Sequence, residues 1–368
     1  MKAMPSLNLT DRTRKLLLSL AVVMAFPAAS ALPQGTASAA ATKYSIVSQP
    51  FKINGTSYHI GTINKNGSTY IALRSIDSAL GLTTRYDPSS RLVQVSGRNR
   101  AMRIGLSTGS ISLNGQPRVG PEAILQNGTT YLPLRFLSEQ FGYEVTYDNP
   151  TKLIGLKALS ENNLSISAET IGADGDGKSL TVFYPVLSGL DNADVQQKIN
   201  SFLKDEANRF VKAGSEQMIP VVQANNELLA KDPNATIRRP TFDGRYTVTY
   251  NEKGQLSLYA DYSVYLGGAH SNTARVAYTF DLSTGERLSL KDVAGDRTDY
   301  VATVNQAIKQ QIADRGLKLI TPFTTIEPDR DFFLRHNGVV VYFTPYEYTS
   351  FADGMPEFVI PYSAFSRT

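Results

Sequence analysis

The chain has 368 residues with no cysteine and no tryptophan, and its formal net charge is +4. The absence of cysteine excludes a disulfide framework, a lipid-modified N-terminal cysteine and a thiolate metal site. Residues 1–31 hold four of the basic side chains, which leaves 33 basic against 32 acidic groups in the rest of the chain. This nearly balanced charge is compatible with a cell-envelope protein and does not predict a nucleic-acid partner.

Residues 1–31 have the pattern of a secretory signal peptide. Basic side chains precede an apolar run over residues 16–26, which is too short to span a bilayer. A small-x-small pattern ends at Ala31 and a second one ends at Ala39, and we expect cleavage after the first. Residues 32–43 then form a linker. The mature chain is predicted to be secreted, extracellular or associated with the cell wall, without stable membrane insertion.

An internal repeat follows the linker, because residues 53–95 match residues 113–156. The stretch from Asn66 to Arg74 recurs 61 positions later as the stretch from Asn127 to Arg135. Each copy predicts an Asn-Gly turn, a short strand, a helix that ends at a glycine, and two closing strands of alternating polarity. The repeat therefore predicts a duplicated small antiparallel sheet with helices, of the α+β class.

The repeat resembles the copper amine oxidase-like N-terminal domain over residues 44–158. The marker is the stretch from Asn127 to Glu139, which begins Asn-Gly-Thr-Thr-Tyr-Leu-Pro-Leu-Arg. The resemblance implies an attachment or spacer module. It does not imply copper chemistry, which needs a histidine-rich site, whereas this region contains only His59. We predict no cofactor and no bound metal.

Residues 160–366 form a second predicted module of the α+β class, with an antiparallel sheet that carries two helices. Hydrophobic periodicity and turn residues place its elements along the chain. The predicted elements are strands at 164–171 and 178–186, a helix at 191–213 that Gly214 ends, hairpins at 245–264 and 275–290, a helix at 299–315, and strands at 338–348 and 357–362.

Segments of this module resemble two types of extracellular domain. Residues 183–190, with the helix after them, resemble the domain found in PdaC-type deacetylases. Residues 265–273 and 343–347 resemble the extracellular half of RsiV-type anti-sigma factors. The resemblance implies a domain pair, at about residues 160–250 and 255–366, which in the RsiV family recognises lysozyme. That family also has a transmembrane helix and a sigma-binding segment, which this sequence lacks, so we do not expect sigma-factor control.

The loop that begins at Tyr265 is the candidate ligand-binding site. Gly267 and Gly268 favour a tight, exposed turn, while the tyrosine, His270 and Asn272 supply aromatic and hydrogen-bonding groups that recognise proteins or sugars. These five residues are the predicted contacts. In the alternative interpretation, the glycines only allow the chain to turn, and the histidine fixes the turn through a backbone hydrogen bond.

The sequence predicts no catalytic residues. Thr241-Phe242-Asp243-Gly244 resembles the start of the polysaccharide deacetylase motif, but the adjoining second aspartate is missing and the three histidines are scattered. We interpret this stretch as a turn. The chain is therefore predicted to be a non-catalytic cell-envelope protein that binds lysozyme or a cell-wall glycan, such as peptidoglycan, through residues 160–366. The alternatives are a peptidoglycan-modifying enzyme, or an accessory subunit of one, and a structural wall protein without a specific ligand.

Overall fold

The computed structural model describes residues 43–295 and 297–366. These residues form two compact units, which we call the N-terminal unit (residues 43–168 and 187–189) and the C-terminal unit (the remainder from residue 169 on). The predicted signal peptide, and the linker up to residue 42, lie outside the described residues. The division into residues 44–158 and 160–366 remains a prediction.

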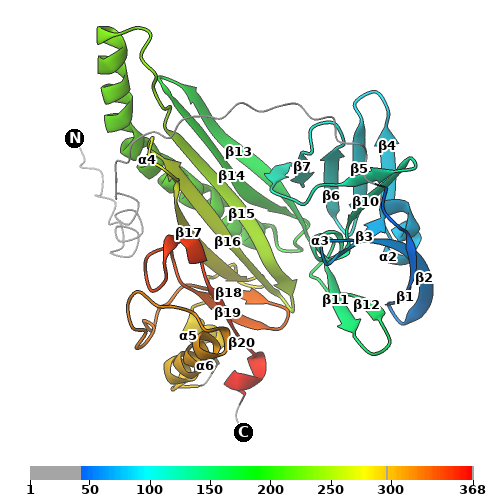
Figure 1. The fold of residues 1–368 in the computed structure, drawn as a ribbon. Helices are drawn as coiled ribbons and strands as arrows, with labels where there is room; N and C mark the ends of the chain where they lie inside the picture. Colours follow the sequence, from blue (N-terminus) through cyan, green and yellow to red (C-terminus); the bar gives the residue numbers. More distant parts are fainter. Residues whose placement is uncertain (1–42, 296, 367–368) are drawn as a thin grey trace. The chain divides into compact units, whose positions relative to one another are not determined.

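The N-terminal unit contains a seven-stranded sheet in the order β11-β12-β1-β2-β3-β10-β9 and a five-stranded sheet in the order β4-β5-β6-β7-β8 (Figure 1). All pairs for which a register is defined are antiparallel except that of β1 with β12. The elements are β1 (Val47–Ile53), β2 (Thr56–Lys65), β3 (Ser68–Ala72), η1 (Leu73–Ser75), α2 (Asp77–Leu80), β4 (Thr83–Asp87), β5 (Leu92–Gly97), β6 (Arg100–Gly105), β7 (Ile111–Leu113), β8 (Gln116–Arg118), β9 (Ile124–Gln126), β10 (Thr129–Pro133), α3 (Leu134–Gln140), β11 (Tyr143–Asp148) and β12 (Leu153–Ala158).

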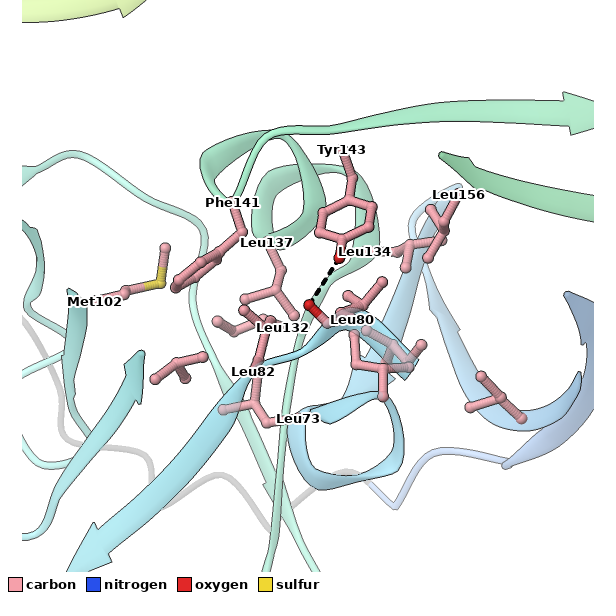
Figure 2. Close-up of a cluster of buried hydrophobic side chains, with 14 of the residues drawn as sticks. Leu73, Leu80, Leu82, Met102, Leu132, Leu134, Leu137, Phe141, Tyr143 and Leu156 are labelled. Atoms are coloured by element: carbon pink, nitrogen blue, oxygen red, sulfur yellow. Dashed lines mark hydrogen bonds between the residues drawn. The ribbon is translucent and has the colours of Figure 1, made fainter. Parts of the chain in front are cut away.

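The two copies of the repeat share one hydrophobic core. Leu80 of the first copy and Leu137 of the second are both buried in it, and the Tyr143 hydroxyl donates a 2.7 Å hydrogen bond to the Leu80 carbonyl (Figure 2). Gly81 and Gly142, which follow the equivalent helices, have φ values of 60° and 71°. Both glycines are in the left-handed region, as the sequence pattern predicts for residues that end helices. The α+β class is confirmed.

The C-terminal unit is built on a five-stranded sheet in the order β13-β14-β15-β16-β17 and a three-stranded sheet in the order β18-β19-β20 (Figure 1). The pair β14 and β15 is parallel. The elements are β13 (Ser165–Gly175), β14 (Lys178–Ser188), α4 (Ala193–Lys231), β15 (Thr241–Glu252), β16 (Gln255–Tyr265), β17 (Asn272–Asp281), α5 (Leu290–Val293), α6 (Tyr300–Arg315), β18 (Phe332–Arg335), β19 (Gly338–Tyr342), η2 (Phe351–Asp353), β20 (Glu357–Ile360) and η3 (Tyr362–Phe365).

The two faces of the five-stranded sheet contact different elements. On one face, Phe210 of α4 stacks on Tyr262, with ring centroids 4.1 Å apart. On the other face, Tyr259 contacts Phe333 of β18 at 5.2 Å. Tyr259 and Tyr262 are three residues apart on one strand, so they point to opposite faces. The small sheet, α5 and α6 form a hydrophobic core to which Tyr250 of β15 also contributes.

Helix α4 is much longer than the sequence predicted. It begins after Asn192, whose side chain accepts hydrogen bonds from two backbone N–H groups of the first turn. It does not end at Gly214, because this glycine is needed for packing rather than for a turn: a Cβ there would lie 2.3 Å from the Phe242 ring. The helix also continues through Pro220.

Alanine at position 214 is expected to destabilise the C-terminal unit by about 1–3 kcal/mol, because the new methyl group would overlap the Phe242 ring. Intrinsic helix propensity alone predicts the reverse, a gain of about 1 kcal/mol. Urea unfolding of the full chain measures the change. Asn208→Ala, on the exposed surface of the same helix, is the control and should be neutral or slightly stabilising. A gain in stability for Gly214→Ala would contradict this packing role.

Several other predicted elements need correction. Residues 241–244 are part of β15 rather than a turn, because they pair with both β14 and β16. The hairpin at 275–290 is reduced to one bridge between Phe280 and Arg287, since the Ser289 capping box starts α5 at the next residue. The strand from Gly338 ends at Tyr342. The predicted pair of domains, at about residues 160–250 and 255–366, would be divided at the turn between β15 and β16. These strands form one hairpin of a single sheet.

Helix α6 agrees with its prediction and ends at Gly316, whose φ is 60°. In the part of the chain that the structure describes, no helix combines the length and the apolar character that crossing a membrane requires.

Candidate functional site

The predicted loop connects β16 to β17 and comprises residues 266–271. Gly267 has a φ of 89°, so a side chain at this position would be strained. Gly268 is different, because no atom lies within 4 Å of the position that a Cβ would take. Tyr265 and Asn272 end and begin the flanking strands, and both are half-buried. Backbone conformation therefore requires glycine at only one of the two predicted positions.

Arg238 stabilises the loop through hydrogen bonds to its backbone. Its Nη1 donates hydrogen bonds to the carbonyl oxygens of Gly267 and Gly268, at 2.9 and 3.3 Å. The Arg238 carbonyl in turn accepts a 3.1 Å hydrogen bond from Nδ2 of Asn225, which lies on the part of α4 beyond Gly214. The unexpected length of the helix thus supports the loop. No sequence pattern connects these residues, and the prediction missed them.

His270 is exposed and stacks on the ring of Phe351, with centroids 3.9 Å apart and an interplanar angle of 20°. Its Nδ1 also lies 3.2 Å from the carbonyl oxygen of Ser271. Tyr346 stacks beyond Phe351 at 6.0 Å. The side chains of Tyr346 and Phe351 are exposed to 55% and 36%. We call His270, Tyr346 and Phe351 the aromatic cluster.

A buried ion pair positions Tyr346. This residue has a φ of 65°, which is unusual for a large side chain and must be held by its surroundings. The adjacent Glu347 pairs through both carboxylate oxygens with Arg330, and one of these distances is 2.9 Å. Glu347 Oε2 also accepts a 2.8 Å hydrogen bond from the backbone of Thr344. Arg330 is only 9% exposed and also donates to the Tyr342 carbonyl, so the turn is tied to β19.

Opposing effects set the pKa of Glu347. Burial alone would raise it, but the hydrogen bond and the positive charge of Arg330, together with bonds from Thr344, outweigh burial and hold the pKa below its ordinary value. The pKa of Arg330 is raised, since pairing with Glu347 outweighs its own desolvation. Both groups are therefore charged at neutral pH.

The Glu347 carboxylate should make the C-terminal unit sensitive to acid. A carboxylate whose pKa is lower in the folded state contributes stability above its ordinary pKa near 4.5, and this stability is lost as pH falls through the folded value. We expect the unfolding free energy to decline below about pH 5. The measurement is urea unfolding across this range. Glu347→Gln should decline less steeply than the native protein, and equal slopes would contradict the assignment.

Ser271 and His270 do not form a nucleophile–base pair in this structure. Ser271 offers its carbonyl oxygen to His270, whereas a nucleophile would need its hydroxyl within reach of the imidazole. Of the other histidines, His59 lies on β2, and His336 contacts the buried carboxylate of Glu252 at 2.9 Å. Within the ranges 43–295 and 297–366, no group of three histidine or acidic side chains is placed to hold a metal ion.

Family comparisons confirm the predicted order of domains. Residues 52–156 match the family described as copper amine oxidase N-terminal domain, residues 173–273 match the family described as deacetylase PdaC, and residues 291–363 match a protein family of unknown function, DUF3298. The aromatic cluster draws one residue from the second match and two from the third. The order is consistent with an RsiV-like architecture.

Among curated proteins, the chain is similar to the anti-sigma-V factor RsiV of Bacillus subtilis. The two are 24% identical over 218 residues, which cover 52% of this chain and 66% of that protein. Among solved structures, a DUF3298 family member from Bacteroides fragilis shares 18% identity at a TM-score of 0.42, over 56% of this chain and 93% of the other. A DUF3298 family protein from Pseudomonas aeruginosa shares 14% at a TM-score of 0.37, over 55% and 93%.

Proposed function

We propose that the chain is an extracellular, non-catalytic recognition protein of the bacterial cell envelope, and that its C-terminal unit binds lysozyme through the aromatic cluster. The likeness to an anti-sigma factor and the order of the three domain matches support an extracellular role. The N-terminal unit serves as a spacer or attachment module. Secretion through the signal peptide of residues 1–31 belongs to the same proposal.

The observation that carries the proposal is a set of exposed, stacked rings on two supported loops. Aromatic side chains that lose little conformational entropy are frequent anchors in protein interfaces. Here Arg238 fixes the loop that carries His270, and the Arg330–Glu347 pair fixes the turn that carries Tyr346. A partner would therefore meet rings that are already ordered. Tyr265, Gly267, Gly268 and Asn272 shape the rim of this surface in the proposal.

A cell-wall glycan is the second candidate ligand, because the exposed faces of stacked rings also suit the apolar faces of sugars. An enzyme acting on peptidoglycan is the third candidate, and the match to the deacetylase PdaC family is the observation that favours it. We propose binding rather than catalysis because the cluster offers exposed ring area, and the Ser271 atom next to the imidazole is a carbonyl oxygen.

Titration calorimetry of the full chain, with lysozyme and with soluble peptidoglycan fragments in separate experiments, tests this function. We expect saturable binding to lysozyme with a stoichiometry of one and no release of products from the fragments. Binding to the fragments alone would replace lysozyme by a glycan as the ligand. Turnover of the fragments, abolished by His270→Ala, would establish an enzyme instead.

A further inference from the structure

The outer face of the second repeat copy contains an open hollow of about 750 Å³ within the N-terminal unit. Its floor is Gly155 of β12, which pairs with Thr146 of β11 on one side and with Lys52 of β1 on the other. A Cβ on Gly155 would lie 2.2 Å from Thr146 Oγ1. The absence of a side chain at this glycine therefore opens the hollow.

The two sides of the hollow carry opposite charges. Glu144 lies on β11, two residues from Thr146 and hence on the same face as Asp148, which accepts hydrogen bonds from Thr151. Lys157 lies on the middle strand β12, opposite Glu144 in the register, and Lys52 projects from β1. The charged side chains of Glu144, Lys52 and Lys157 are all exposed. Across residues 43–295 and 297–366, no ion pair involves any of the three. Their charges are available to a ligand.

The first repeat copy provides an internal comparison. The outer-face residues of the closing hairpin differ between the copies, whereas the inward-facing residues are apolar in both except for Thr84, which corresponds to Val145. Across the offset of 61 residues, the outer-face pairs are Thr83 and Glu144, Arg85 and Thr146, Gln94 and Gly155, and Ser96 and Lys157. Longer side chains thus stand where the second copy has its glycine floor. The first copy forms the same hairpin with these longer side chains, so the fold does not require glycine at this position.

We propose that this hollow binds a short, extended peptide that carries an ammonium group and a carboxylate. Adjacent strands lie about 4.8 Å apart, so the β11 and β1 sides are separated by about 10 Å. The two charges of a free amino acid are too close together to reach both sides. Two or three extended residues, at about 3.4 Å each, span the distance. The ammonium group then faces Glu144 and the carboxylate faces Lys52.

The probe is the synthetic peptide N-acetyl-Lys-Gly-Gly, titrated into the full chain and followed by NMR. We expect saturable shifts at backbone amides of β1, β11 and β12. The C-terminal amide of the same peptide lacks the carboxylate and should bind several-fold more weakly, since an exposed ion pair contributes up to about fivefold in affinity. Lys52→Gln should weaken binding of the acid peptide and leave that of the amide peptide unchanged.

The decisive variant is the double exchange Thr146→Arg with Gly155→Gln, which copies the residues of the first repeat into the second. The first copy already accommodates this pair in one register, so the hairpin should remain folded, as the amide spectrum would show. We expect at least a tenfold loss of peptide binding. Equal binding by the native and exchanged proteins, or no saturable binding by the native protein, would overturn the proposal. Neither result bears on lysozyme recognition by the C-terminal unit.

Discussion

Replacing Arg330 by methionine is expected to lower the unfolding free energy of the C-terminal unit by about 3–5 kcal/mol, because removing one partner of a buried pair leaves the other charge uncompensated. Arg330 is 9% exposed and contacts both oxygens of Glu347 as well as the Tyr342 carbonyl. Methionine restores part of the apolar volume but none of these bonds. The stranded carboxylate should also release the turn that holds Tyr346 at its positive φ.

Urea unfolding followed by circular dichroism measures this loss. Lys198→Met is the matched control. The side chains of Lys198 and Glu286, which form an ion pair, are 46% and 71% exposed, so this pair should contribute less than about 1 kcal/mol to the unfolding free energy. The double variant Arg330→Met with Glu347→Leu should recover part of the stability, since it removes the unpaired charge. An effect of Arg330→Met no larger than that of Lys198→Met would show that the pair does not support the turn.

Replacing Phe351 by alanine is expected to weaken lysozyme binding about 30-fold, which corresponds to about 2 kcal/mol for a residue at the centre of an interface. Phe351 lies between His270 and Tyr346, so its removal takes away the ring on which both stack. The ring is 36% exposed and belongs to a short 3₁₀ turn. The loss of stability should therefore be small, and the melting temperature should change by only a few degrees.

Calorimetric titration of Phe351→Ala with lysozyme gives the affinity, and thermal unfolding gives the stability. Ile320→Ala is the control, because Ile320 is an apolar side chain of the same unit with 56% exposure and lies outside the aromatic cluster. It should bind like the native protein. Native affinity in folded Phe351→Ala would remove this ring from the site, whereas a large fall in melting temperature would assign it a structural role.

Local sequence patterns predict much of the fold, because they reflect backbone chemistry within a few residues. The duplicated Asn-Gly turns appear with left-handed asparagines, as at Asn66 and Asn127, where φ is 53° in both. The buried apolar residues of α6 and the glycine that ends this helix could likewise be predicted from neighbouring residues alone. The role of Gly214 in α4 is not local, because the space that a Cβ would need at this position is filled by the ring of Phe242, which is distant in the sequence.

Only part of the candidate site could be predicted from the sequence, because its other residues are distant along the chain. The Gly267–His270 loop could be identified because its glycines mark a turn. Its partners Phe351 and Tyr346 lie some eighty residues further on, and local patterns in a single sequence give no means of bringing them to His270. The one available signal was that residues 343–347 and the loop resemble the same family.

Amide hydrogen exchange of the full chain, with and without saturating lysozyme, tests the central claim most directly, because it locates the contact as well as detecting it. The aromatic cluster predicts slower exchange in two segments, residues 266–271 and 344–353, with little change in the N-terminal unit. Protection confined to α4, to the N-terminal unit or to no segment at all would contradict recognition through these two loops.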